Sequence, residues 1–100
     1  MPAHYILNAN GEPERCDDMR KWHEWMEQTW GPRYIAREKI GSSEVATRLT
    51  GSDLSSGEGP PILFRTTIRR GKHDKYSEYY STREDALAGH AIMLQIVHSG

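Results

Sequence analysis

The segment ILFRTTIRR, residues 62 to 70, decides the fold of this chain. Two sets of side chains alternate along it: Ile62, Phe64, Thr66 and Ile68 in one set, and Leu63, Arg65, Thr67 and Arg69 in the other. Because successive side chains of a strand point to opposite faces of a sheet, this alternation predicts a strand with one apolar face and one basic face. An apolar face needs a covering layer, so the rest of the chain should supply further strands and helices.

Two further strands are predicted upstream of this segment. The first runs from Arg33 to Ile40 and the second from Glu44 to Thr50, with a Gly-Ser-Ser turn between them. In the second strand Val45, Thr47 and Leu49 alternate with Glu44, Ala46 and Arg48. Downstream, a polar turn over residues 71–75 precedes Tyr76 to Tyr80, which is expected to extend the sheet. Strands joined by short turns usually pair antiparallel.

A first helix is predicted before these strands. Asp17 or Asp18 caps it, and it runs to about Thr29, before Gly31-Pro32. Its apolar stripe consists of Met19, Trp22, Trp25 and Met26. Trp22, Trp25 and Trp30 cannot all point in one direction on a helix. Either one of them is partly exposed, as an anchor for a partner, or all three cover a small core.

A second helix is predicted at the C-terminal end. It begins at Ser81 or Thr82, because Ser81 with Glu84, or Thr82 with Asp85, fits a capping box. The apolar residues that continue it are Ala86, Leu87, Met93, Leu94 and Val97. This helix supplies a covering layer for the sheet.

The N-terminal residues predict a small hairpin. Tyr5-Ile6-Leu7 is rich in strand formers, Asn10-Gly11 is a strong turn signal, and Pro13 cuts the return strand short. We therefore expect an α+β fold: a two-layer sandwich with an N-terminal hairpin, a helix, a three-stranded antiparallel sheet and a C-terminal helix, both helices covering one sheet face. Its length of 100 residues is that of a single domain, residues 1–100.

Composition narrows the classes of function. With 13 basic and 14 acidic residues the net charge is −1, which excludes a uniformly basic nucleic-acid binder but allows a local basic face. Cys16 is the single cysteine, so intrachain disulfides and thiolate metal clusters are excluded. There is neither a signal-peptide pattern nor a run of about 18 apolar residues, so we expect a cytoplasmic protein with no membrane segment.

A Gly/Ser-rich stretch, TGSDLSSGEGPPILF (residues 50–64), separates two of the predicted strands. It lacks the lysine of a phosphate-binding loop and carries Asp53 and Glu58, which repel phosphate. Two carboxylates in this spacing do not match a calcium loop either. We interpret the stretch as a long connection within the domain whose tip is a candidate contact loop. The tip consists of Asp53, Leu54, Ser55, Ser56, Gly57 and Glu58.

The second candidate site is a basic face of the sheet. If the apolar strand residues face the helices, the opposite face collects Arg33, Arg37, Lys39, Arg48, Arg65 and Arg69. Such a face suits nucleic-acid phosphates or an acidic protein, or it is simply a solvent-exposed sheet face. The same register turns Glu38 inward and Ile35 outward, which calls for a bulge or a different register in that strand.

No catalytic or metal site is predicted. The histidines, His4, His23, His73, His90 and His98, show no metal-ligand spacing. His90 lies on or beside the buried stripe of the last helix, as a core or boundary residue, and Cys16 is a small residue before a helix cap. No serine sits in a nucleophile motif. We therefore expect a protein that is not an enzyme and has no cofactor.

Short motifs spread over most of the chain carry a resemblance. They are an Asn-Gly-Glu-Pro turn and a Cys-Asp before a Trp-containing helix (residues 10–25), Ile40-Gly41, Val45-Ala46-Thr47, Gly51-Ser52-Asp53, Gly59-Pro60-Pro61-Ile62-Leu63-Phe64, Tyr80-Ser81-Thr82 and Ala88-Gly89-His90. This set resembles a group of small proteins encoded in bacteriophage and prophage genomes. The departures are Ser52, Leu54–Ser56 and Arg69-Arg70. The resemblance implies a phage origin and one compact fold, and it carries over no catalytic residue.

Two hypotheses of function follow. The first is a small non-enzymatic phage accessory protein that binds a host or phage protein in the cytoplasm of a bacterial host; the resemblance implies inhibition of a host machine or defence system. The alternative is a nucleic-acid-binding module that uses the basic sheet face. Double-stranded-RNA-binding domains share the order helix, three strands, helix, but Glu84 and Asp85 stand where those domains place cations. A homodimer that buries the bare sheet face is compatible with this architecture.

Overall fold

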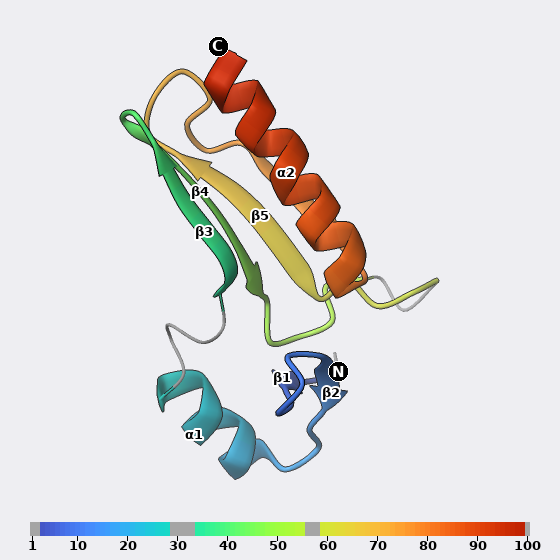
Figure 1. Cartoon of the computed structure of the whole chain (residues 1–100). Coiled ribbons are helices and arrows are strands. Elements are labelled where there is room, and N and C mark those ends of the chain that lie inside the picture. The colour runs from blue at the N-terminus through green and yellow to red at the C-terminus, as the bar shows by residue number, and fades with distance from the viewer. Residues whose placement is uncertain (1–2, 29–33, 56–58, 100) are drawn as a thin grey trace.

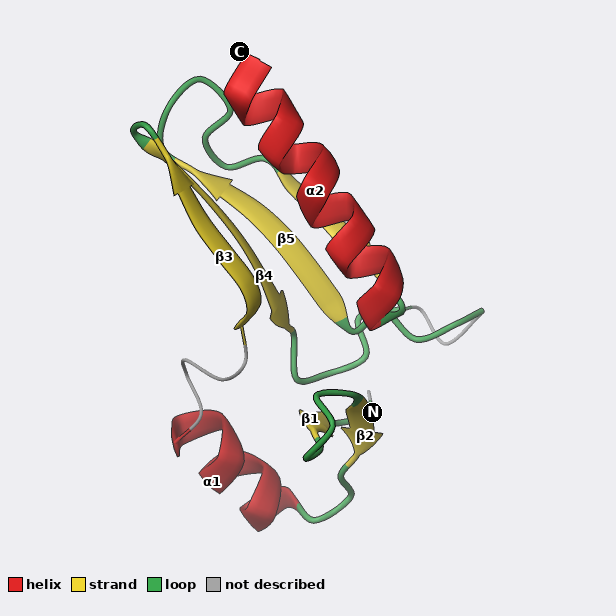
Figure 2. Ribbon diagram, in the orientation of Figure 1, coloured by secondary structure: helices red, strands yellow, loops and turns green. Residues whose placement is uncertain are grey.

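The computed structural model shows a four-stranded sheet with a long helix on one face, and a two-stranded hairpin with a shorter helix beyond one end of the sheet (Figure 1 and Figure 2). The structure describes residues 3–28, 34–55 and 59–99. In chain order the elements are β1 (Tyr5–Leu7), β2 (Pro13–Arg15), α1 (Met19–Gln28), β3 (Tyr34–Ile40), β4 (Ser43–Leu49), β5 (Phe64–Arg69), β6 (Ser77–Tyr80) and α2 (Arg83–Ser99). The expected α+β class is confirmed.

The main sheet has the order β3-β4-β5-β6, with every neighbouring pair antiparallel. The sheet therefore has one strand more than the three predicted, because Ser77–Tyr80, within the expected extension at residues 76–80, pairs fully with β5. The turn before β6 makes this possible. Arg70 and Lys75 take positive φ values of 66° and 71°, and the Lys75 N–H donates to the Ile68 carbonyl at 2.8 Å. The chain thus reverses tightly and returns beside β5.

Helix α2 covers one face of this sheet and packs against all four strands (Figure 1). The alternation of β4 and β5 explains its position, because both strands bury their apolar set beneath it. Two apolar clusters result: Leu49, Leu63, Phe64 and Ala86 in one, and Val45, Ile68 and Met93 in the other. Within the described residues, no helix is both long and apolar enough to cross a membrane.

A buried polar cluster accompanies these apolar ones beneath α2. Thr47 Oγ1 lies 2.6 Å from Thr66 Oγ1 and 2.7 Å from His90 Nδ1. His90 Nε2 lies 3.3 Å from a carboxylate oxygen of Glu38, outside hydrogen-bond geometry. Hydrogen bonding offsets the cost of burying both hydroxyls, so threonines can occupy core positions of two adjacent strands.

A β-bulge in β3 explains how both Ile35 and Glu38 fit the sheet. The register with β4 shifts between Tyr34 and Ala36, which turns Ile35 against the apolar cluster of Leu49, Leu63, Phe64 and Ala86. Beyond the bulge, Glu38 lies opposite Val45 and faces α2 at the sheet edge, near His90. Of the two possibilities, the bulge is the one that occurs.

Helix α1 does not cover the sheet face, so the expectation that both helices do was wrong. It lies beside the hairpin beyond one end of the sheet (Figure 1). The hairpin is held there because the Tyr5 N–H donates to the Gly51 carbonyl at 2.9 Å and the Asp53 N–H donates to the Ala3 carbonyl at 2.9 Å. Trp22 of α1 donates its indole N–H to the same Gly51 carbonyl at 2.9 Å.

The hairpin turn differs from the expected two-residue turn. The Gly11 N–H donates to the Asn8 carbonyl, the Asn8 N–H donates to the Glu12 carbonyl, and Gly11 has a positive φ of 76° whereas Asn10 does not. Pro13 is the first residue of β2, a position where a missing N–H is tolerated, so it starts the return strand instead of cutting it short.

The helix caps settle two open alternatives. The Asp18 carboxylate accepts the N–H groups of Arg20 and Lys21 at 3.1 and 3.2 Å, so Asp18 caps α1. The Thr82 hydroxyl accepts the Asp85 N–H at 3.1 Å and caps α2.

Trp22 and Trp25 are both half-buried. The predicted helix end at Thr29, Gly31-Pro32, and the residues Trp30 and Arg33, lie outside the described residues.

Candidate functional site

The face of the sheet opposite α2 carries most of the predicted basic residues. Register places Arg37 opposite Ala46, Lys39 opposite Glu44, Arg48 opposite Arg65, and Glu44 opposite Arg69. These residues share one face because they stand in phase with one another and out of phase with the buried set of β4 and β5. We call this surface the open face. The structure brings Arg37, Lys39, Arg48, Arg65 and Arg69 together there; Arg33 is outside its described part.

The cations of the open face are largely uncompensated. Glu44 is the single acidic residue among the described strand residues of this face, and its carboxylate lies 3.3 Å from Arg37 Nε. Arg48, Arg65 and Arg69 form no ion pair with any residue that the structure describes. Since the whole chain has a net charge of −1, positive charge is concentrated on this face and negative charge lies elsewhere.

Arg48 and Arg65 stand directly opposite each other in adjacent strands. Like charges in directly opposed positions destabilise a sheet by roughly the same 0.2–1 kcal/mol that opposite charges contribute. Arg65 also has a buried Nε that makes no hydrogen bond within the described part of the chain. Both features cost stability in the free protein, and an anion bound between the two guanidinium groups would offset their mutual repulsion.

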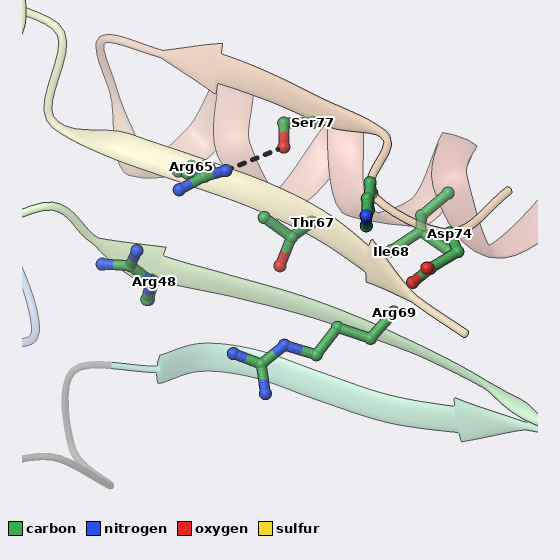
Figure 3. A pocket seen from close by; sticks show the side chains of 8 residues that line it. Arg48, Arg65, Thr67, Ile68, Arg69, Asp74 and Ser77 are labelled. Carbon is green, nitrogen blue, oxygen red and sulfur yellow. Dashed lines mark hydrogen bonds between the residues drawn. The ribbon is translucent and has the colours of Figure 1, made fainter.

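A hollow of about 370 Å³ lies around Thr67 on this face (Figure 3). Its lining consists of Arg48, Arg65, Thr67, Ile68, Arg69, Asp74, Lys75 and Ser77. The Arg65 guanidinium donates to the Ser77 hydroxyl at 3.1 Å, which holds the side chain along the sheet. Arginine guanidiniums with unused N–H donors, beside hydroxyl groups, form a surface that suits phosphate or carboxylate oxygens.

Two tyrosines complete the open face, and the sequence analysis missed both as site residues. The Arg37 guanidinium lies 5.1 Å from the Tyr34 ring centroid, and the Arg65 guanidinium lies 5.6 Å from that of Tyr79. Tyr79 is 47% exposed. The signal for Tyr79 was its register with Arg65, which could be used only once β6 was known to pair with β5. Tyr34 was hidden by the bulge that follows it.

The predicted contact loop divides into two parts. The Asp53 carboxylate accepts the N–H groups of Ser55 and Ile62 at 2.8 and 2.9 Å. These backbone hydrogen bonds, that of Ser55 first, hold the Asp53 pKa below its ordinary value. Asp53 therefore closes the base of the loop. Leu54 is exposed and lines an apolar hollow of about 280 Å³ with Ile62 and Tyr79. Residues 56–58 of the tip lie outside the described residues.

The side chains of His90 and Cys16 are buried and contact groups inside the protein. The order Glu38, His90, Thr47 looks like a proton relay, but the Thr47 side chain is fully buried and no substrate can reach it. Cys16 is buried and donates its S–H to the Asp18 carbonyl at 3.6 Å, where α1 begins. In the chain segments that the structure describes, no group of His, Cys, Asp or Glu is arranged to hold a metal ion.

Comparison of this chain with protein families, with curated proteins and with solved structures found no match. The resemblance to small phage and prophage proteins, and the phage origin that it implies, therefore remain predictions.

Proposed function

We propose that this chain is a non-enzymatic binding module whose open face binds nucleic acid. The observation that carries the proposal is the concentration of Arg37, Lys39, Arg48, Arg65 and Arg69 on one sheet face of a chain with a net charge of −1. Phosphates of a nucleic-acid backbone match a line of cations better than isolated carboxylates do, because their negative charges repeat at a short spacing.

Side-chain chemistry adds to this support. Arginine binds phosphate oxygens through a fork of N–H donors, and a tyrosine ring offers a flat surface to a base. The open face carries both kinds of group at directly opposed positions, with Arg48 opposite Arg65 and Arg65 opposite Tyr79. A binding role also accounts for the position of Arg48 opposite Arg65. Residues that are kept at a cost in stability are typical of a binding site.

The experiment is a titration of labelled DNA and RNA at low salt, followed by fluorescence anisotropy. Binding should weaken steeply as salt rises, because each phosphate contact releases counterions. The double variant Arg65→Glu/Arg69→Glu should lose binding. The matched control is Arg20→Glu/Lys21→Glu, which makes the same change in charge on exposed positions of α1.

Two results would contradict the proposal. One is the absence of nucleic-acid binding at low salt by a folded protein. The other is an equal loss of affinity in the α1 control, which would show that overall charge, and not the open face, governs binding.

A protein partner is the second candidate, and the apolar hollow of Leu54, Ile62 and Tyr79 favours it. An exposed leucine beside an exposed tyrosine forms a small apolar patch, which is typical of protein contacts. The partner proposed from the phage resemblance is a host or phage protein in the bacterial cytoplasm, with inhibition of a host machine or defence system as the outcome. Affinity capture from host lysate with the wild type and with Leu54→Glu tests it; a partner retained equally by both would argue against this patch.

A further inference from the structure

One row of side chains crosses the whole open face. Strand register places Tyr34 opposite Arg48, Arg48 opposite Arg65, and Arg65 opposite Tyr79. The row thus runs perpendicular to the strands, with an aromatic ring at each end and two guanidinium groups between them. Three spacings of about 4.8 Å between neighbouring strands give it a length of about 14 Å.

Each ring of this row has an arginine beside it. Arg37 lies 5.1 Å from the Tyr34 ring centroid and Arg65 lies 5.6 Å from that of Tyr79. A flat ring next to a cation suits a ligand that joins a flat group to an anionic group, since the ring stacks on the one and the cation binds the other.

Two of the hollows on the open face favour the same kind of ligand. The larger is lined by Arg48, Arg65 and Arg69, and the smaller by Leu54, Ile62 and Tyr79. Arg65 of the larger hollow stands opposite Tyr79 of the smaller one, and its guanidinium lies 5.6 Å from the Tyr79 ring centroid. A cationic hollow beside an apolar, aromatic one therefore needs a partner in which anionic and flat apolar groups are neighbours.

Nucleotides of a single strand meet this requirement, because their phosphates and unpaired bases are both accessible. A duplex presents its phosphates but keeps its bases stacked and paired inside. An acidic peptide presents carboxylates without a flat ring at each step. The charge alone would suit all three partners, and the tyrosines favour the single strand.

We infer that the open face binds single-stranded nucleic acid across its strands, with one base stacked on Tyr79, another on Tyr34, and the intervening phosphates on Arg48 and Arg65. This inference rests on the nucleic-acid binding proposed above. At about 3.4 Å per nucleotide of a stacked strand, the row covers about four nucleotides, and fewer of an extended strand.

The test measures the affinity of the full chain for three probes at one low salt concentration. The probes are an unstructured single strand of about eight nucleotides, longer than the row, in DNA and RNA forms; the corresponding duplex; and an abasic strand of equal length and charge. We expect the single strand to bind more tightly than either the duplex or the abasic strand.

Variants of Tyr79 identify the stacking surface. Tyr79→Ala should weaken single-strand binding about fivefold or more and leave abasic-strand binding unchanged, while Tyr79→Phe should retain the wild-type affinity. The matched control is Tyr76→Ala. Tyr76 is 46% exposed, against 47% for Tyr79, but its hydroxyl donates to Glu78, whose position opposite Thr66 puts it on the face that α2 covers. Circular dichroism confirms that each variant is folded.

Failure of the inference can be told apart from failure of the proposed function. If no probe binds, nucleic-acid binding itself is wrong. If the duplex or the abasic strand binds as tightly as the single strand, or if Tyr79→Ala has no effect, the face binds phosphates and the stacking is wrong. An equal loss of affinity in Tyr76→Ala and Tyr79→Ala would also overturn the assignment of Tyr79.

Discussion

The two faces of the main sheet are built from the same strands, and they treat polar groups in opposite ways. On the face that α2 covers, the hydroxyls of Thr47 and Thr66 are buried and bonded to each other and to His90. On the open face, Arg48 and Arg65 stand opposite each other without an ion pair to any described residue. Among the described residues, the covered face bonds its buried hydroxyls within the protein but leaves His90 Nε2 without a hydrogen bond, whereas the open face leaves Arg48 and Arg65 without an ion pair.

Under the proposed function, this difference separates stability from binding within one short sequence. Residues 64–69 alternate between the faces, so adjacent positions should respond in opposite ways to substitution. Changes to the covered face should unfold the protein before they alter binding. Changes to the open face should alter binding and leave stability nearly constant or slightly raised.

The largest expected effect breaks the covered face. Phe64 is 0% exposed, so Phe64→Ala should lower the free energy of unfolding by about 3–5 kcal/mol, through lost burial and the cavity left behind. Its neighbour Arg65→Ala should change it by less than about 0.5 kcal/mol. Urea unfolding followed by tryptophan fluorescence measures both. If Phe64→Ala does not fold, Phe64→Leu is measured in its place. A Phe64 variant that lowers the free energy of unfolding no more than Arg65→Ala does would contradict the difference between the two faces.

The next effect uses two adjacent threonines on opposite faces. Thr66→Val removes the buried hydrogen bond to Thr47 and should cost about 1 kcal/mol. Thr67→Val removes a hydroxyl from the open face and should be neutral or slightly stabilising, because valine suits a strand. Thermal unfolding of the two isosteric variants measures the difference, and equal melting temperatures would show that the buried cluster does not distinguish the faces.

A smaller effect of opposite sign is expected on the open face. Arg48→Thr removes the like-charge pair with Arg65 and should raise the free energy of unfolding by about 0.2–1 kcal/mol while weakening nucleic-acid binding. The stabilisation should shrink as salt screens the repulsion between the arginines. Urea unfolding at low and high salt, with a binding titration on the same variant, checks it. A destabilised variant, or one with unchanged binding, would remove the proposed conflict between stability and function.

The smallest effect concerns the loop between β4 and β5. The Asp53 pKa is held low by the backbone N–H groups of Ser55 and Ile62, so its contribution to stability is present above the ordinary carboxyl pKa and is lost as pH falls through the lowered folded-state pKa. Acidification should therefore increase amide exchange at Ser55 and Ile62, after correction for the intrinsic exchange rate. In Asp53→Asn this pH dependence should be absent. Identical profiles in the wild type and the variant would show that these bonds do not depend on the charge.

Much of the sheet could be predicted because its signal is local. The alternation of apolar and basic residues in the 44–50 and 62–70 segments identified two strands and assigned the side chains of β4 and β5 to the correct faces. The assignment was wrong just before β5 begins at Phe64, because Leu63 is buried in the core and Ile62 lines the hollow beside Tyr79. The caps at Asp18 and Thr82 were among the predicted alternatives for the same reason, since a cap depends on residues a few positions away.

What could not be predicted depends on contacts between distant segments. The bulge that turns Ile35 inward is decided by the register between β3 and β4. The location of α1 depends on hydrogen bonds from Tyr5 and Trp22 to the Gly51 carbonyl, which no periodicity reveals. Treating both helices as covers for one face was therefore a reasonable inference from pattern and a wrong one.

The sequence by itself determined which side of each central strand is apolar and which is basic, because side-chain direction along a strand follows from backbone geometry alone. Only the tertiary structure decided that Tyr34, Arg48, Arg65 and Tyr79 form one row, because a row across a sheet exists only after four strands have chosen their registers. Registers are set by turns, bulges and packing against α2, which involve residues far apart in the chain. The basic face was thus visible in the sequence, and its tyrosine-flanked row became visible only in the fold.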